Sequence, residues 1–309
     1  MKEKTQHYCG IGGQAVLEGV MMKNGDRYAV AVRRENGEIV TSLDTYRGIL
    51  ADLPLRKIPF ARGFLVLLDS LILGLKVTDY SASMYEDGTD SGEKKDGEGG
   101  DSLVTALVLI VSLALSVGLF IVLPYLAASF LSSRIGSQNI LVVLEGVIRI
   151  AVFIGYILAI SAMKDIHRLF QYHGAEHKCI NCIESGLPLT VENARKSTRL
   201  HKRCGSSFTL FVMLVSIILF FFIRVDSHIL RIVLRILLIP VISGISFEII
   251  RLSGMSSSPI VAAIAKPGLM MQYLTTREPD DEMLEVGIAS VNAVYDWHEY
   301  LKEEFGVSA

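Results

Sequence analysis

Two signals that would suggest a soluble binding function are missing from this 309-residue chain. No basic run with interleaved aromatic residues occurs, so no nucleic-acid partner is expected, and the formal net charge of −2 argues neither for nor against a partner. The glycine-rich stretch 10–19 lacks the Gly-Lys-Ser/Thr ending of a phosphate loop. We therefore interpret this stretch as closely packed backbone and turns, which glycine permits.

Secretory and repeat signals are missing too. The polar residues 1–9 are not followed by an apolar core with a small-residue cleavage site, so we expect the membrane spans themselves to target the chain. No internal repeat of about 20–50 residues is present.

Long apolar stretches are what the sequence does contain. Hydrophobic residues make up 51% of the chain and the mean hydropathy is +0.44. A helix needs about 20 apolar residues to cross roughly 30 Å of hydrocarbon, because it satisfies its own backbone polar groups there. Four stretches meet this requirement, at 103–131, 140–163, 207–223 and 229–250. The sequence thus predicts an α-helical membrane protein with about four transmembrane helices, in hairpins at 103–163 and 207–250.

The basic residues next to the spans predict the orientation. Residues 164–206 between the second and third spans contain eight Lys and Arg, whereas the connection 132–139 contains Arg134 alone. Residues 164–206 are therefore expected in the cytoplasm, with both termini. The basic residues Arg224, Arg231 and Arg235 near the opposite side argue against this orientation. In a reducing compartment the four cysteines are more suited to metal binding than to disulfides.

The remaining segments are predicted to be small cytoplasmic or interfacial units. Residues 1–57 form a β-rich unit, in which Asn36-Gly37 favours a two-residue type I′ turn between strands at 28–34 and 38–43. Residues 58–85 are apolar but contain charges, which predicts an interfacial or re-entrant helix. Residues 86–101 are expected to be a disordered acidic linker. Residues 251–309 form a cytoplasmic helical region whose final helix packs on the N-terminal unit.

The candidate chemistry begins with His173, Glu176 and His177. On a helix the two histidines are one turn apart, so both imidazoles can reach one cation. Glu176 lies beside them, where it can act on a bound water as the general base. This His-x-x-Glu-His spacing is that of the inverzincin metallopeptidases. The third ligand of such an open site is left unassigned among Glu18, Glu184 and Glu192.

A second ligand set follows directly. Cys179-x-x-Cys182 precedes His201-x-x-Cys204, a spacing similar to that of a structural Cys₃His zinc site. We expect a closed structural site from Cys179, Cys182, His201 and Cys204, and an open site from His173 and His177. Mixed imidazole and thiolate ligands favour Zn²⁺.

Ionisable residues also lie within the predicted spans, where each is costly unless paired. Glu145 and Arg149 are four residues apart on one helix, so they can pair with each other. The alternative is a polar path for a substrate or ion.

Three motifs together carry a family resemblance, at residues 12–22, 173–178 and 275–281. They are similar to motifs of the YqhQ-like bacterial integral membrane proteins, a family of unknown function described as predicted metal-dependent enzymes. The resemblance covers nearly the whole chain. It implies a location in the bacterial plasma membrane and a metal-dependent activity without a defined substrate.

Three functions remain open on the sequence. The first is a membrane-embedded metal-dependent hydrolase acting at the cytoplasmic membrane surface. The second is a zinc-stabilised scaffold that assembles with a membrane-protein partner. The third is a transporter that uses the intramembrane charges, which requires a homo-oligomer because four spans are few for a monomeric carrier.

Overall fold

The computed structural model of the protein describes residues 7–49, 51–52, 54–86, 99–131, 134–223, 225, 227–256 and 258–307. The chain divides into two compact units. The first unit contains Met1–Gly88, Ile160–Phe211 and Ile239–Ala309, and the second contains Thr89–Ala159 and Val212–Leu238. Most of the predicted acidic linker, residues 87–98, lies outside the described residues.

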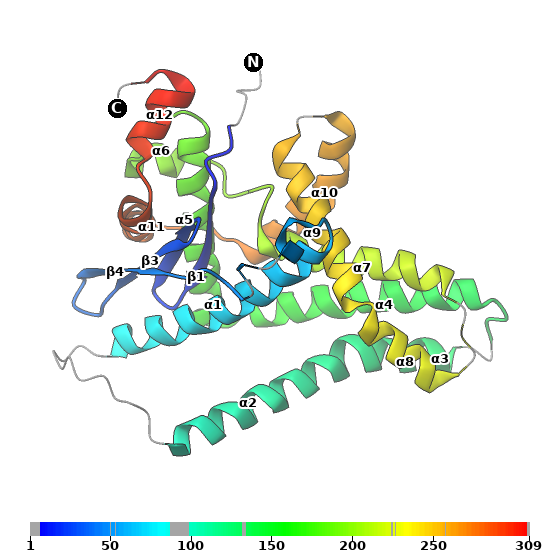
Figure 1. The fold of residues 1–309 in the computed structure, drawn as a ribbon. Helices are drawn as coiled ribbons and strands as arrows, with labels where there is room; N and C mark the ends of the chain where they lie inside the picture. Colours follow the sequence, from blue (N-terminus) through cyan, green and yellow to red (C-terminus); the bar gives the residue numbers. More distant parts are fainter. Residues whose placement is uncertain are drawn as a thin grey trace. The chain divides into compact units, whose positions relative to one another are not determined.

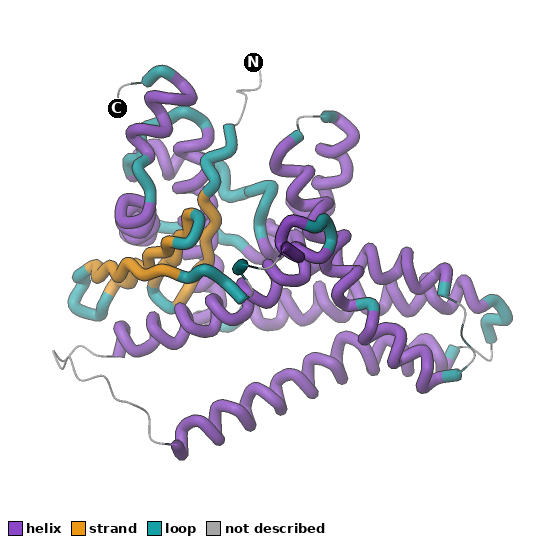
Figure 2. The backbone as a smooth tube through the Cα atoms, viewed as in Figure 1, coloured by secondary structure: helices purple, strands orange, loops and turns teal. Residues whose placement is uncertain are grey.

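A four-stranded antiparallel sheet forms near the N-terminus of the first unit (Figures 1 and 2). Its strands β1 (Ile11–Val16), β2 (Gly19–Asn24), β3 (Arg27–Arg33) and β4 (Ile39–Thr45) lie in sequence order. The interpretation of residues 10–19 as closely packed backbone and turns is confirmed for the close packing at Gly13 and Gly19, but residues 11–16 form a strand and only residues 17–18 a turn. Short glycine-rich segments show weak strand propensity, and here the β1–β2 pairing outweighs it.

The predicted hairpin at 28–43 is present, but its turn differs from the expected one. The Gly37 amide donates to the Arg34 carbonyl, and the Arg34 amide donates to the Glu38 carbonyl. Gly37 has φ +87°, whereas Asn36 is not among the non-glycine residues with positive φ. A type I′ turn needs positive φ at both central residues, so the loop has three residues, with glycine in the left-handed position.

Both faces of the sheet are covered by helices of the same unit. On one face, Val16, Met21 and Val30 pack with Leu73 and Val77 of α1 (Ala61–Glu86). On the other face the sheet packs on α5 (Lys164–Glu184) and α11 (Asp281–Val294). Since side chains alternate along a strand, burial of both faces explains why β3 is buried almost throughout.

The C-terminal helix α11 is held on the sheet by specific contacts. The Ser290 hydroxyl of α11 donates to the Ala29 carbonyl of β3. Asp280 caps the helix by accepting from the Met283 amide, and Asp281 and Glu282 lie in its first turn. The other helices of this unit are η1 (Pro54–Lys57), α6 (Val191–Lys196), α9 (Ile239–Met255), α10 (Pro259–Thr275) and α12 (Trp297–Phe305).

Arg62 and Asp69, the charges that interrupt the apolar part of predicted segment 58–85, have partners in the first unit. Arg62 of α1 forms a bidentate pair with Glu248 of α9, with both N···O distances 2.6 Å. Asp69 pairs with Arg56 at 2.5 Å. The charges that interrupt this apolar segment are thus neutralised locally, and α1 runs as one continuous helix.

The second unit contains α2 (Gly99–Val117), the π-helix η2 (Gly118–Val122), α3 (Leu123–Phe130), α4 (Gln138–Ile160) and α8 (His228–Leu237). Helix α7 (Gly205–Phe222) contributes to both units. Among the described residues, three helical stretches are long and apolar enough to cross a membrane, namely Ile110–Phe130, Asn139–Ile160 and Gly205–Phe222. They correspond to the first three predicted spans.

The prediction of a fourth span at 229–250 is wrong, because these residues do not form one continuous helix. Helix α8 ends at Leu237, and α9 begins at Ile239 with Pro240 in its first turn. Proline is tolerated there because the backbone N–H groups of a first helical turn have no intrahelical partner, so the N–H that proline lacks is not needed. Instead α9 and α10 form a pair bent by 117° that is apolar enough to be one broken span or a re-entrant loop. The described part of the chain therefore holds three candidate spans, or four with this pair.

The predicted pairing of Glu145 and Arg149 is confirmed. Arg149 donates to Glu145 at 2.7 Å, and Arg235 of α8 approaches the same carboxylate at 2.7 Å. Arg149 also donates to the Ser216 hydroxyl and to the Phe120 carbonyl, each at 3.1 Å. Because Phe120 lies in the π-helix, the disrupted helical hydrogen-bond pattern supplies a carbonyl for the buried guanidinium.

Gly174 in the middle of α5 has a packing reason. A Cβ at this position would lie 2.0 Å from the Arg277 carbonyl oxygen. The Arg277 amide in turn donates to the Phe170 carbonyl of α5 at 2.8 Å, which holds the segment against the helix. Glycine therefore offsets its poor helix propensity by admitting a close approach of backbone.

We predict that Gly174→Ala destabilises the fold by about 2 kcal/mol, because the added methyl group meets rigid backbone. The matched control is Gly155→Ala in α4, where nothing lies within 4 Å of the added Cβ. That change should be neutral or stabilising by up to about 1 kcal/mol through helix propensity. Thermal unfolding in detergent micelles, followed by circular dichroism, measures both, and equal midpoints for the two variants would contradict the packing argument.

Candidate metal site and adjoining cavity

The His-x-x-Glu-His segment lies on α5, where the helical repeat places His173 and His177 on one face. Their ring centroids are 4.4 Å apart. Cys204, directly before α7, joins them, and the three potential ligand atoms all lie within 4.8 Å of one another. These side chains are therefore the group that could hold a metal ion within the described residues.

The two imidazoles are oriented by backbone carbonyls. The Nδ1 atom of His173 is 2.8 Å from the Thr275 carbonyl oxygen, and Nδ1 of His177 is 2.6 Å from that of Arg199. Each Nδ1 therefore carries a proton, and each Nε2 is left for another partner. Nε2 of His177 is buried and has no hydrogen-bond partner within the described part of the chain. This orphaned acceptor fits a metal ligand.

Cys204 and His173 form a close pair, with Sγ 3.2 Å from Nε2. Burial disfavours the thiolate, but the neighbouring His173 and His177 outweigh it and hold the pKa of Cys204 well below its ordinary value. Burial likewise disfavours the imidazolium, but the Cys204 thiolate raises the pKa of His173 to about 9. The environment thus stabilises the thiolate, which is the form that binds metals.

Glu176 lies in the same helical turn and faces strand β1. Its side chain is 4% exposed, and a Cβ on Gly13 would lie 2.7 Å from its Cγ. Burial raises the pKa of Glu176, although His177 and His173 partly oppose the shift. Gly13 therefore admits the Glu176 carboxyl group against the strand, and the carboxyl is poised to exchange a proton closer to neutral pH.

A cavity of about 730 Å³ adjoins this group within the first unit. His173, Glu176, His201 and Cys204 line one part of it. Apolar side chains supply much of the remaining wall, from α1, α5, α7 and α9: Val66, Leu67, Leu71, Leu73, Leu169, Phe170, Phe208, Phe247 and Ile250. Charged side chains also line the cavity, among them Lys23, Arg56, Asp69 and Arg203. A cavity that combines an apolar wall with convergent polar groups is typical of a site for a small ligand.

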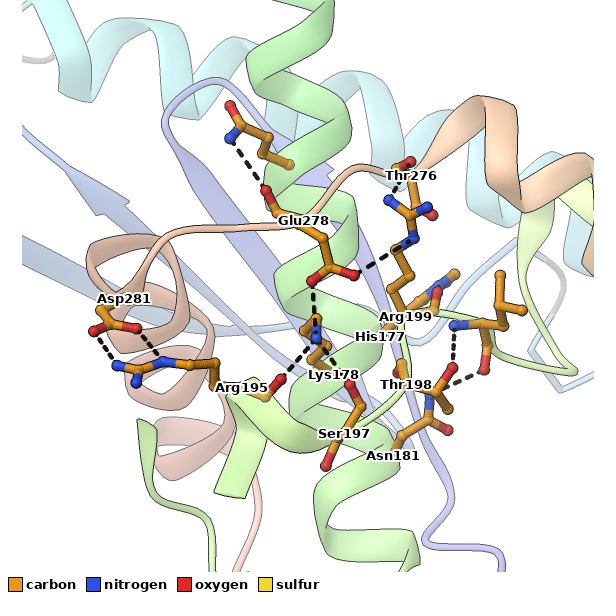
Figure 3. Close-up of polar contacts among 12 residues, drawn as sticks. His177, Lys178, Asn181, Arg195, Ser197, Thr198, Arg199, Thr276, Glu278 and Asp281 are labelled. Carbon is orange, nitrogen blue, oxygen red and sulfur yellow. Dashed lines mark hydrogen bonds and ion pairs between the residues drawn. The ribbon is translucent and has the colours of Figure 1, made fainter. Parts of the chain in front are cut away.

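Residues 195–204 bring Cys204 to the histidines, and polar residues of α5 hold this segment in place (Figure 3). Lys178 donates to the Arg195 and Ser197 carbonyls, both at 2.9 Å, and pairs with Glu278 at 3.0 Å. Asn181 donates to the Thr198 carbonyl at 2.7 Å. Because these bonds fix the segment, the Arg199 carbonyl lies where His177 needs a partner.

The structure groups the predicted ligands differently from the expected Cys₃His set. Cys179 packs against Gly287 of α11, and Cys182 lies 3.5 Å from the Pro188 carbonyl, both in the hydrophobic core. Burial raises the pKa of Cys179, and it raises the pKa of Cys182 to about 11. On a helix these residues point away from the His173 face, so Cys204 joins the histidines instead.

His201 lies beside this group, with its ring centroid 5.4 Å from that of His177. The backbone of His201 is fixed by Gln272, which accepts from its amide and donates to its carbonyl, both at 2.7 Å. Nε2 of His201 is 3.7 Å from the Glu184 carboxylate. His201 thus lines the cavity next to the three grouped ligands.

The carboxylates considered as a third ligand have other partners. Glu18 pairs with Arg168 and accepts from the Tyr172 hydroxyl, and Glu192 pairs with exposed Lys196. Glu184 is buried, pairs with Arg203 and accepts from the Cys9 amide at 3.1 Å. Despite burial, His201 and Arg203 lower the pKa of Glu184 to about 2.

Sequence reasoning did not anticipate the contact of Gly13 with Glu176, or the pairing of Glu184 with Arg203 and the Cys9 amide. The proximity of Gly13 to Glu176 joins residues far apart in the chain, and no short spacing reveals it. The motif at residues 12–22 was a usable signal, since it was one of the three that carried the family resemblance.

Comparison with known proteins shows the family to which the chain belongs. A family model described as "Protein of unknown function (DUF1385)" matches residues 58–297. The uncharacterized protein YqhQ of Bacillus subtilis (strain 168) is 37% identical over 292 residues, which cover 91% of each chain. No solved structure matches the chain. The resemblance to the YqhQ-like family is therefore confirmed.

The contacts of Glu184 with Arg203 and His201 can be tested through the pH dependence of stability. The folded pKa of Glu184, about 2, lies below the ordinary 4.5, so its contribution to stability is complete above about pH 4.5 and is lost as the pH falls toward 2. We predict that Glu184→Gln costs on the order of 3 kcal/mol at pH 7. The deficit in the thermal midpoint should shrink as the pH falls through this range.

The control is Glu192→Gln, because that carboxylate is exposed. It should leave the midpoint unchanged at pH 7. A deficit for Glu184→Gln that stays constant from pH 7 to pH 3 would show that the charge of Glu184 is not responsible.

Proposed function

We propose that this chain, which belongs to the DUF1385 family of proteins of unknown function, is a membrane-embedded metal-dependent hydrolase. One observation carries the proposal. Three potential ligands, His173, His177 and Cys204, lie together, and His173, Cys204 and the buried Glu176 line a cavity of about 730 Å³. Metal-assisted hydrolysis needs this combination of ligands, proton acceptor and space for a substrate.

Zn²⁺ is the metal that suits the ligands best. His173 and His177 offer Nε2 atoms and Cys204 offers a thiolate, a mixture that zinc accepts, and a bound cation would displace the proton that the Cys204 thiolate favours on His173. Zinc held by these three residues would have a position left for water or substrate, and it would supply Lewis acidity and lower the pKa of a bound water to about 7.

Glu176 is the proposed general base. Glu176 directly precedes His177 in the sequence, and it lines the cavity described above. Accepting a proton from water requires a pKa not far below the working pH, and burial raises the pKa of Glu176 in that direction. The same group can then return the proton to the leaving atom of the substrate.

The scaffold alternative is less consistent with this geometry. A structural zinc site is closed by four protein ligands, whereas the group here has three and adjoins a cavity. The transporter alternative relied on intramembrane charges, and Glu145 is already engaged by Arg149 and Arg235. Such pairing is what a structural role predicts.

The proposed location of the reaction is the cytoplasmic membrane surface. The helix that carries the histidines begins four residues after the candidate span Asn139–Ile160, and Cys204 precedes the candidate span Gly205–Phe222. Both parts of the ligand set are thus adjacent in sequence to span ends. The excess of Lys and Arg in residues 164–206 supports a cytoplasmic side, with the lipid bilayer as immediate partner.

Metal analysis of the purified full chain in detergent tests the site. We expect about one zinc ion per chain in the wild type, and a loss of most of it in His173→Ala and Cys204→Ser. Cys182→Ser is the matched control because Cys182 lies in the core, so this variant should keep its zinc. Wild-type protein without bound metal, or loss of zinc in the control alone, would contradict the assignment.

Hydrolysis is tested separately with Glu176→Gln. The amide cannot accept the proton, so this variant should keep its zinc and lose about 10²–10⁴-fold in rate. Labelled casein and p-nitrophenyl butyrate serve as amide and ester probes. A wild type that cleaves neither probe, or a variant as fast as the wild type, counts against the hydrolase.

A further inference from the structure

Strand β1 is an edge strand of the sheet and has an open side. The strand order is β1-β2-β3-β4, so β1 pairs with β2 alone. The two-residue connection Leu17-Glu18 makes Val16 and Gly19 a hydrogen-bonded pair, and such pairs alternate along an antiparallel ladder. The N–H and C=O groups of Ile11, Gly13 and Ala15 therefore point away from β2.

The outward groups of Gly13 and Ala15 lack partners in the part of the chain that the structure describes, whereas the Cys9 thiol lies within hydrogen-bond reach of the Ile11 backbone. The hydrogen bonds among residues 7–49 and the other described ranges include none to the backbone of Gly13 or Ala15. Gly12 and Gly13 are exposed, so solvent or a ligand can reach this side. The edge offers a row of backbone donors and acceptors to an incoming strand.

The composition of β1 also fits a binding edge. Exposed edge strands are usually protected from pairing by charged residues, proline or a bulge. Strand β1 contains no charged residue and no proline, and its register with β2 is continuous. The opposite edge strand β4 contains Asp44 and is largely exposed. The two edges of one sheet thus differ, and the unprotected one borders the proposed site.

Contacts place this edge at the reacting groups. Gly13 faces Glu176 so closely that a Cβ would lie 2.7 Å from its Cγ. Gly12, Gly13, Gln14 and Ala15 line the same cavity as His173 and Cys204. A strand added to β1 would therefore run past the proposed general base, with side chains directed into the apolar part of the cavity.

From this geometry we infer that the substrate is an extended polypeptide segment that pairs with β1 and is cleaved at the bond beside Glu176. The inference rests on the proposed hydrolase function and defines its substrate class. In the reaction, water adds its hydroxyl to the peptide carbonyl carbon, the C–N bond breaks, and the proton taken up by Glu176 passes to the leaving amine. A lipid acyl chain could fill the apolar cavity but would leave the backbone groups of β1 unpaired, because it has no hydrogen-bond donors.

Binding is tested without catalysis, using the full-length Glu176→Gln protein in detergent micelles. A randomised octapeptide library is the peptide probe, and lysophosphatidylglycerol is the lipid probe. We expect retention of peptides, identified by mass spectrometry. One retained peptide is then resynthesised in two forms, with N-methyl groups on the odd-numbered or on the even-numbered backbone amides. Only every second amide of a paired strand faces β1, so one form should bind about tenfold more weakly and the other much less so.

Variants of the two sheet edges supply the matched comparison in the same Glu176→Gln background. Ala15→Pro removes an outward N–H from β1 without touching the β1–β2 ladder, and it should weaken peptide binding about tenfold. Thr41→Pro makes the same change on the outward side of β4 and should leave binding unchanged. The N-methylated peptides give an answer even where a proline variant does not fold.

The outcomes separate the two proposals. Retention of the lipid probe without any peptide, or equal binding of N-methylated and unmodified peptides, would overturn the peptide inference. Neither result touches metal content or ester hydrolysis. Conversely, a wild type that binds peptides but holds no zinc and cleaves nothing would overturn the hydrolase and leave the strand pairing in place.

Discussion

The need to satisfy buried polar side chains on α5 organises the first unit. His177, Lys178, Asn181 and Glu184 are all buried on this helix, and each would be costly without partners. Backbone carbonyls of residues 195–200 accept from the first three, and Arg203 pairs with Glu184. The segment that supplies these partners leads directly to Cys204. The contacts that satisfy the buried side chains of α5 therefore also bring Cys204 next to His173 and His177.

Close backbone approach is the second requirement of the site. Gly174 admits the Arg277 carbonyl against α5, which brings the Thr275 carbonyl to His173. Gly13 admits the Glu176 carboxyl group against β1. In both places a side chain would push apart the elements whose contact forms the site. Glycine is therefore needed for the close approach, although it is unfavourable within a helix or a strand.

In the second unit, too, buried charged side chains need partners, here among apolar helices. Glu145 carries one negative charge between Arg149 and Arg235, and the π-helix supplies the Phe120 carbonyl to Arg149. Each buried charge thus has a partner from another element or turn. The i,i+4 spacing predicted the first pair, whereas the participation of Arg235 requires α8 to fold back onto α4, which no local pattern encodes.

The sequence by itself determined the local features of this protein: three apolar stretches, the hairpin at 28–43, and the one-turn separation of His173 and His177. Each follows from composition or periodicity within one element. The tertiary structure alone decided that Cys204 joins the histidines while Cys179 and Cys182 enter the core, that 229–250 is broken, and that an open strand edge borders Glu176. The physical reason is that ligand grouping depends on which helix faces meet, and a spacing pattern counts residues along the chain without recording that direction.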